Sequence, residues 1–332
     1  MNQDFMKTKP IFPLVLSMSL PMMLSMLINS LYNIIDSMFV ARIGEDALTA
    51  VSLVYPLQTL VVSISVGFGV GINAAVAFFL GAGEKENADR SAAQGLLLSL
   101  LHGALLSVGG FLCIPYFLPL FTSDARILDW GMEYAYIVLS FSMVITVQIA
   151  FEKIYQAVGN MLVPMVCMAA GCITNIILDP VFIFGLGPIP RLEVKGAAIA
   201  TVIGQVVTLI LYLIWYFCKD MGLSLGRRNM KLTGEICGKL YTVGVPCSLT
   251  MGLPSLLITV LNGFAAAFSP VYILILGVYF KLQSFIYLPA NGIVQGMRPI
   301  LSYNYGAGEK KRMRRIIQIC SVMILVIMAA GM

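Results

Sequence analysis

The chain of 332 residues is 59% hydrophobic and only 11% charged. Soluble domains carry about a quarter charged residues, so this composition excludes an ordinary soluble protein and indicates a chain that lies mostly in lipid. The net charge of +5 does not indicate a nucleic-acid partner, because the basic residues sit in short loops between apolar runs, where they orient membrane proteins.

Apolar runs long enough to cross a bilayer recur along the whole chain. A membrane-spanning helix needs about 20 mostly apolar residues. Hydropathy predicts spans at 12–40, 50–80, 93–120, 130–156, 161–186, 195–218, 239–268, 271–302 and 316–332. Transmembrane barrels instead show short segments that alternate apolar and polar residues, and these runs do not alternate. We therefore predict an all-α integral membrane protein, a polytopic helical bundle.

Lysine and arginine predict the orientation of these spans. With a cytoplasmic N-terminus, the inside segments hold fifteen of them, Lys153 included, and the outside loops hold four. Positive residues concentrate on the cytoplasmic side of membrane proteins. We therefore expect a multi-pass protein of the prokaryotic plasma (inner) membrane with its N-terminus in the cytoplasm.

An internal repeat organises the chain. The stretch GAGEK occurs at Gly81–Lys85 and again at Gly306–Lys310, 225 residues later. The same offset relates three further pairs: Pro21 and Pro246, Gly67 and Gly292, and Gly71 and Gly296. Repeats with this even helix count run in the same direction, about an axis along the membrane normal. The GxxxG spacing of the glycines indicates close helix packing.

The repeat also predicts the domain boundaries. We expect a complete six-helix N-terminal lobe at 1–218, a cytoplasmic inter-lobe loop at 219–238 and an incomplete C-terminal lobe at 239–332. The fold class is thus two parallel-repeat lobes. Because the second unit shows three helices where the first has six, we expect three more helices in a complete protein and interpret the chain as C-terminally truncated.

Ionisable residues inside the spans are functional candidates, because burying them in lipid is costly. Asp36 and Asp179 lie at similar depth near the outer ends of the first and fifth spans. Asn29 and Asn33 share a helix face with Asp36, and Tyr32 lies one turn away. A polar face of this kind should line an internal cavity.

The fifth span carries a matching stripe of Gly171, Asn175 and Asp179 on one face. Two carboxylates close together in a low-dielectric site cannot both stay ionised. We therefore expect Asp36 and Asp179 to take up a proton or a sodium ion. The competing interpretation is a structural polar contact between helices near the membrane surface.

Three further features need an interpretation. Pro21, early in the first span, predicts a kink because it removes a backbone hydrogen bond. Lys281 lies near the middle of the eighth span with no acid in the seventh or eighth to pair with it, which makes it a candidate central cation. Residues 222–226 match the GxSxG pattern of hydrolases, but no strand precedes them and the single histidine, His102, lies inside a span, which argues against a catalytic triad.

Four stretches resemble one transporter family. They are PMMLSMLINSLYNIIDSMFVARIGEDALTA at 21–50, GAGEKENADR at 81–90, TNIILDPVFIFGLG at 174–187 and LPANGIVQGMRPILSYNYGAGE at 288–309. Together they resemble the multidrug and toxin extrusion (MATE) family, most closely its DinF-like branch. The resemblance runs through the whole chain and covers about the first three-quarters of a typical member. It implies two six-helix lobes around a central cleft and transport by alternating access.

The resemblance also implies a set of site residues. An N-lobe cavity of this family would be lined here by Tyr32, Asp36, Tyr134, Asn175 and Asp179, and the proline that bends on protonation would be Pro21. Another branch of the family carries an acid in the seventh helix. Here the repeat counterpart of Asp36 is Leu261, so we expect the ion site in the N-lobe.

These observations predict a secondary antiporter that exports organic cations or drugs in exchange for protons or sodium. We expect no enzymatic activity, no cofactor and no metal apart from sodium at Asp36 and Asp179. The expected partners are small cationic or amphipathic molecules and membrane lipids, with no nucleic acid, and the complete protein would be a monomer. The alternatives are a flippase of lipid-linked oligosaccharides from the same superfamily and a membrane-embedded enzyme.

Overall fold

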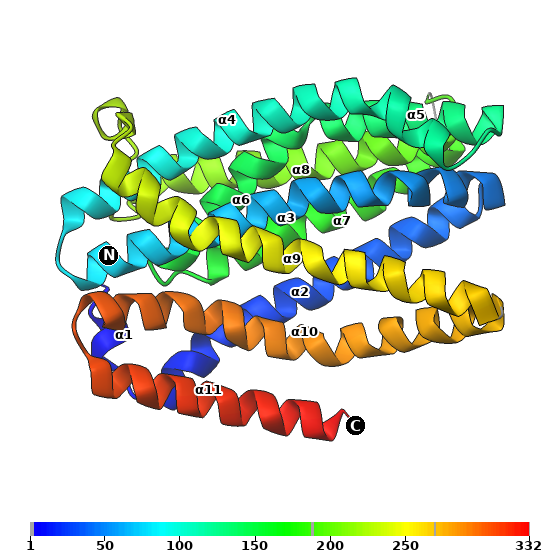
Figure 1. Ribbon diagram of the computed structural model, residues 1–332. Coiled ribbons are helices and arrows are strands. Elements are labelled where there is room, and N and C mark those ends of the chain that lie inside the picture. The colour runs from blue at the N-terminus through cyan, green and yellow to red at the C-terminus, as the bar shows by residue number, and fades with distance from the viewer. Residues whose placement is uncertain (1–2, 187–188, 269, 332) are drawn as a thin grey trace.

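The computed structural model describes residues 3–186, 189–268 and 270–331, and this part of the chain is helical without a strand. Helices lie roughly along one common direction (Figure 1). In chain order they are α1 (Phe5–Thr8), α2 (Ile11–Ala41), α3 (Glu45–Gly81), α4 (Lys85–Phe117), η1 (Leu118–Leu120), α5 (Ala125–Ser140), α6 (Ser142–Ala157), α7 (Leu162–Phe184), α8 (Glu193–Cys218), η2 (Arg227–Met230), α9 (Gly234–Phe268), α10 (Pro270–Gly306) and α11 (Lys310–Ala330).

The protein is a multi-pass membrane protein. Among the residues described, six helices are long and apolar enough to cross a membrane, or seven if the bent pair of α5 and α6 is one span. That pair occupies the predicted span 130–156 and bends by 45°. The hydroxyl of Ser142 donates to the carbonyl of Leu139 at 2.7 Å, and Ser107 of α4 donates to the carbonyl of Ser140 at 3.0 Å. These hydroxyls provide hydrogen bonds to carbonyl groups at the break between α5 and α6, where the regular helical hydrogen bonding is interrupted.

One end of the bundle carries the N-terminus together with the turns at 82–84, 158–161 and 307–309 and the loop at 219–233 (Figure 1). We call it the basic end. Short helix α1 is fastened there: Met6 is fully buried, and its carbonyl accepts a hydrogen bond from Asn304 Nδ2 at 3.0 Å. Helix α1 is thereby held against α10 of the second repeat.

The two repeats contact each other through reciprocal glycine crossings. A Cβ on Gly67 would lie 2.4 Å from the Cα of Ser248, and one on Gly292 would lie 2.8 Å from the Cα of Met23. Residue 248 is itself the repeat counterpart of residue 23, so α3 packs on α9 as α10 packs on α2. The prediction of close helix packing at these glycines is confirmed.

Reciprocal close contacts of the same kind occur at the basic end. A Cβ on Gly81 would lie 1.9 Å from the carbonyl oxygen of Tyr303, and one on Gly306 would lie 2.0 Å from that of Phe78. Tyr303 and Phe78 are again 225 residues apart. Because both repeats end their second helix at the same end of the bundle, they run in the same direction, as the sequence predicts.

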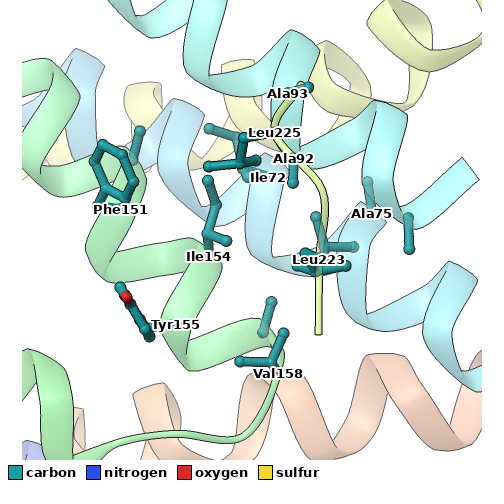
Figure 2. Close-up of a cluster of buried hydrophobic side chains, with 14 of the residues drawn as sticks. Ile72, Ala75, Ala92, Ala93, Phe151, Ile154, Tyr155, Val158, Leu223 and Leu225 are labelled. Atoms are coloured by element: carbon teal, nitrogen blue, oxygen red, sulfur yellow. The ribbon is translucent and has the colours of Figure 1, made fainter. Parts of the chain in front are cut away.

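The loop that follows α8 seals the basic end of the first repeat. Leu223 and Leu225 insert among Ile72, Ile154 and the alanines of α3 and α4 (Figure 2). The backbone N–H of Ser224 donates to Asp89 Oδ1 at 2.9 Å. The GxSxG stretch is therefore a packing segment that anchors the loop.

Two lysines singled out in the sequence have different outcomes in the structure. Lys153, which the sequence analysis counts with the inside segments, lies within α6 and is only 3% exposed. Lys281, the candidate central cation, lies outside the residues whose side chains are described. Its backbone belongs to α10.

Candidate functional site

The candidate site forms where α7 and α8 cross. A Cβ on Gly171 would lie 2.7 Å from the carbonyl oxygen of Gly204, and one on Gly204 would lie 2.8 Å from that of Gly171. Two glycines therefore let the two backbones approach directly. One turn further along, this approach brings Asn175 of α7 against Thr201 of α8.

Two carboxyl groups meet at this crossing. Those of Asp36 on α2 and Asp179 on α7 lie next to each other. Asp179 is fully buried. An ionised carboxylate only accepts hydrogen bonds, so a bond between two carboxyls needs a proton on one of them. The structure thus brings the two candidate acids together as a pair that can share a proton.

Asn175 links the acid pair to α8. Its Nδ2 donates to Asp179 Oδ1 and to Thr201 Oγ1, each at 3.4 Å. Its own Oδ1, like Asp36 Oδ1 and Asp179 Oδ2, is buried with no hydrogen-bond donor among the described residues. Three acceptor oxygens of the cluster therefore have no hydrogen-bond donor in the described part of the chain.

Two tyrosines close the site. The side chains of Tyr32 on α2 and Tyr134 on α5 both lie close to Thr201 of α8. Gln58 Nε2 of α3 donates to the Tyr134 hydroxyl at 3.4 Å. Tyr134 is only 3% exposed. Helices α2, α3, α5, α7 and α8 of the first repeat therefore all contribute to one cluster.

Two of the predicted residues stay apart from this cluster. Asn33 is exposed, and its Nδ2 donates to the Asn29 carbonyl at 2.7 Å instead of joining the acids. Pro21 lies on the same helix as Asp36, fifteen residues earlier or about 22 Å along the axis. Helix α2 is continuous through it, and Ser25 Oγ donates to its carbonyl at 2.9 Å.

Sequence reasoning missed Thr201 and Gln58. Neither carries a charge, so neither stands out in an apolar span. The signal that could have found Thr201 is Gly204, one turn away, since a small residue marks a close crossing at which a hydroxyl meets the next helix. For Gln58 we find no comparable signal.

The chemistry of the cluster suits a small hard cation or a proton. It offers two carboxyls, an amide oxygen and a threonine hydroxyl, and oxygen ligands of this kind bind hard cations. Within the described part of the chain, no group of three or more His, Cys, Asp or Glu side chains is placed to hold a metal ion.

Comparison with known proteins agrees with this architecture. The MatE family model matches residues 21–181 and 246–332. The two matched segments begin 225 residues apart, the offset of the internal repeat. The fold and the paired repeats define a membrane transporter, and the chain belongs to the MatE family.

Several individual proteins are similar over most of the chain. The multidrug export protein MepA of Staphylococcus haemolyticus is 26% identical over 329 residues, which cover 99% of this chain and 72% of that protein. The FAD transporter of Shewanella oneidensis is 26% identical over 318 residues, covering 96% and 70%. A solved outward-facing multidrug resistance MATE family transporter of the MOP superfamily superposes with a TM-score of 0.92 at 25% identity, covering 99% and 72%.

Proposed function

We propose that this protein is a secondary antiporter that exports organic cations or drugs in exchange for protons or sodium ions. The observation that carries the proposal is the pair of half-buried Asp36 and fully buried Asp179, in which Asp36 Oδ1 and Asp179 Oδ2 have no hydrogen-bond partner among the described residues. Membership of the MatE family and the similarity to the export protein MepA support the same reading.

The proposed cycle uses competition for one negative site. With both carboxyls ionised, the pair attracts a cationic substrate, and a proton or sodium ion arriving from outside neutralises it and weakens that attraction. Tyr32, Tyr134 and Thr201 would supply neutral contacts to either occupant. Because α2 carries both Asp36 and Pro21, neutralisation of the acid pair can shift the part of that helix at Pro21.

We also propose how the protein sits in the membrane. The basic end faces the cytoplasm of a prokaryotic cell, in agreement with the positive-inside rule. The contacts of Gly81 with Tyr303 and of Gly306 with Phe78 close that end, so the conformation is the one closed to the cytoplasm. Similarity to a solved outward-facing transporter supports this assignment.

The remaining parts of the proposal concern organisation. Residues 1–218 act as one lobe, the loop at 219–238 connects it to the second, and residues 239–332 belong to the second lobe. The protein works as a monomer surrounded by lipid, without a cofactor and without enzymatic activity. Its assignment to the DinF-like branch stays a prediction.

Gradient-driven efflux of the cationic dye ethidium from loaded vesicles tests the function. We expect efflux under an inward proton or sodium gradient, and its loss to the vesicle leak rate in Asp36→Asn, because the amide imitates the protonated acid with almost the same shape. Asp46→Asn is the matched control, since Asp46 is exposed and pairs with Arg126 at 3.7 Å. Efflux that ignores both gradients, or that survives in Asp36→Asn at normal expression, would contradict the proposal.

A further inference from the structure

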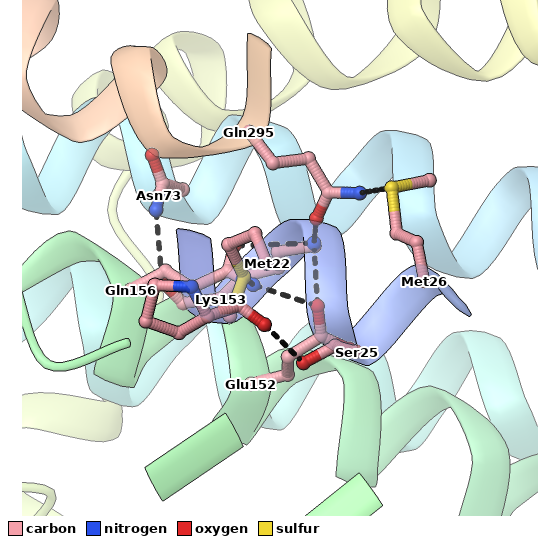
Figure 3. A network of polar contacts seen from close by, with 9 residues as sticks. Met22, Ser25, Met26, Asn73, Glu152, Lys153, Gln156 and Gln295 are labelled. Atoms are coloured by element: carbon pink, nitrogen blue, oxygen red, sulfur yellow. Dashed lines mark hydrogen bonds and ion pairs between the residues drawn. The ribbon is translucent and has the colours of Figure 1, made fainter. Parts of the chain in front are cut away.

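A second buried polar network lies away from the acid pair and joins the two repeats. Its centre is Lys153 of α6, which is 3% exposed (Figure 3). The Lys153 ammonium donates to Glu152 Oε1 at 2.7 Å, to Gln156 Oε1 at 3.2 Å and to Gln295 Oε1 at 3.1 Å. A lysine has three N–H donors, so all of them are engaged.

Neighbouring helices are shaped around this lysine. A Cβ on Gly69 of α3 would lie 2.8 Å from Lys153 Cγ, so the absence of a side chain there makes room for the lysine stem. Asn73, one turn further along α3, donates from Nδ2 to the carbonyl of Lys153 at 3.1 Å. The position of Lys153 is therefore fixed by α3 as well as by α6.

The network also reaches α2, the helix of Asp36 and Pro21. Gln156 Nε2 donates to Met22 Sδ at 3.1 Å, and Gln295 Nε2 donates to Met26 Sδ at 3.5 Å. These methionines are one turn apart, one and five residues after Pro21 in the first half of α2. A shift of this part of α2 would therefore move the two amides that hold the ammonium.

Among the described residues, one partner of the ammonium comes from the second repeat. Glu152 and Gln156 lie on α6 with the lysine, whereas Gln295 lies on α10. If the repeats separate, the Glu152–Lys153 ion pair stays together and loses only a neutral acceptor. Separating two buried charges would cost far more, so this arrangement allows a contact that opens and closes reversibly.

An apolar cluster, which we call the seam, lies between α2 of the first repeat and helices α10 and α11 of the second. Met18 and Met22 of α2 pack there with Ile293 of α10 and with Ile316 and Cys320 of α11. Cys320 is 1% exposed. Any opening of the basic end that parts α2 from α10 and α11 must expose this seam.

We propose that Lys153 is a positioning residue of the transport cycle, which holds the basic end closed by donating to Gln295 across the two repeats. The inference rests on the proposed function, since it assigns the contact to one state of an alternating-access cycle. In the open state Gln295 leaves with α10, and water takes its place at the ammonium. Helix α2 couples this event to the acid pair, because its methionines contact the same amides.

Chemical modification of the native Cys320 thiol measures how often the seam opens, because this thiol is buried within it. We would treat Gln295→Leu and the wild-type protein in membranes with N-ethylmaleimide and measure modification of Cys320 by peptide mass spectrometry. We expect modification about tenfold faster in the variant, the change in an equilibrium constant that follows from losing one hydrogen bond to a charged group. Cys167 is the internal reference, because it is fully buried within the first repeat.

Two further variants make the test specific. Gln283→Leu is the same substitution on the same helix, and Gln283 donates to the hydroxyls of Tyr279 and Tyr287 rather than to the network; Cys320 should react in it as in wild type. Glu152→Gln combined with Lys153→Met removes the charged pair as a unit, and in that background Gln295→Leu should have no further effect.

Unchanged Cys320 modification in Gln295→Leu would overturn the inference. So would an equal acceleration at Cys167, which would indicate a general loss of packing, or a full effect of Gln295→Leu in the background without the charged pair. Thiol modification needs no transport. If dye efflux failed to depend on either gradient, the Cys320 modification rates could still show whether Lys153 and Gln295 hold the two repeats together. The two proposals can therefore fail separately.

Discussion

Adding one methyl group at Gly296 should weaken the seam between the repeats. In Gly296→Ala the new Cβ would lie 2.5 Å from Ser19 Oγ and 2.7 Å from both Ser19 Cα and Ser19 N. The hydroxyl can rotate away, but the backbone atoms cannot. Since carbon atoms rest at about 3.5–4.0 Å, α2 and α10 must separate by about 1 Å.

The expected cost follows from that displacement. Overpacking of a close contact costs ~1–3 kcal/mol, so the thermal unfolding midpoint of the purified protein in detergent should fall by a few degrees. The matched control is Gly109→Ala in α4, where a Cβ would meet nothing within 4 Å. Alanine is the better helix former by about 1 kcal/mol, so this control should unfold at the wild-type temperature or slightly above it.

Static light scattering or tryptophan fluorescence during heating gives both midpoints, and Cys320 modification gives a second readout of the same seam. Gly296→Ala should accelerate that modification, and Gly109→Ala should not. Equal midpoints and equal Cys320 reactivity in the two variants would refute the reasoning that this glycine is needed for the approach of α2 to α10.

Three other expectations follow from the structure. Thr201→Val keeps the shape but removes the hydroxyl that accepts from Asn175; gradient-driven dye efflux should fall several-fold at normal expression, and unchanged efflux would remove Thr201 from the site. Pro21→Ala should slow efflux while leaving dye binding, measured by fluorescence anisotropy, largely intact; equal loss of both would indicate a purely structural proline. Leu225→Asp places a charge at a side chain that is 6% exposed, so it should lower the yield of folded protein in size-exclusion chromatography, whereas Leu232→Asp, at a position that is 46% exposed, should not.

The sequence by itself determined the class of the fold. Runs of apolar residues longer than a bilayer is thick can only be helices, because lipid offers no partner for exposed backbone groups. The recurrence of GAGEK at a fixed offset, together with the even number of helices in the first unit, predicted two units with the same direction. The rarity of ionisable residues within spans singled out Asp36 and Asp179, since each such residue must be compensated inside the protein.

Helical periodicity alone could not predict which side chains of different helices contact each other. Asn33 and Asp36 are three residues apart, or about 60° around an α-helix, and that angle is enough to leave Asn33 exposed while Asp36 turns towards Asp179. Periodicity assigns residues to a face but does not say which helix covers the face. Thr201 and Gln58 could therefore be assigned to the site only once α8 and α3 were placed beside α7 and α5.

Lys153 shows the same limit most clearly. From the sequence it is a basic residue at the end of an apolar run, which is where lysines usually meet water. Burial of its ammonium becomes tolerable only because Glu152, Gln156 and Gln295 supply three acceptors at once, and one of these lies 142 residues away in the chain. Such compensation depends on contacts between repeats, so only the tertiary structure could decide that this lysine lies inside the protein and joins its two halves.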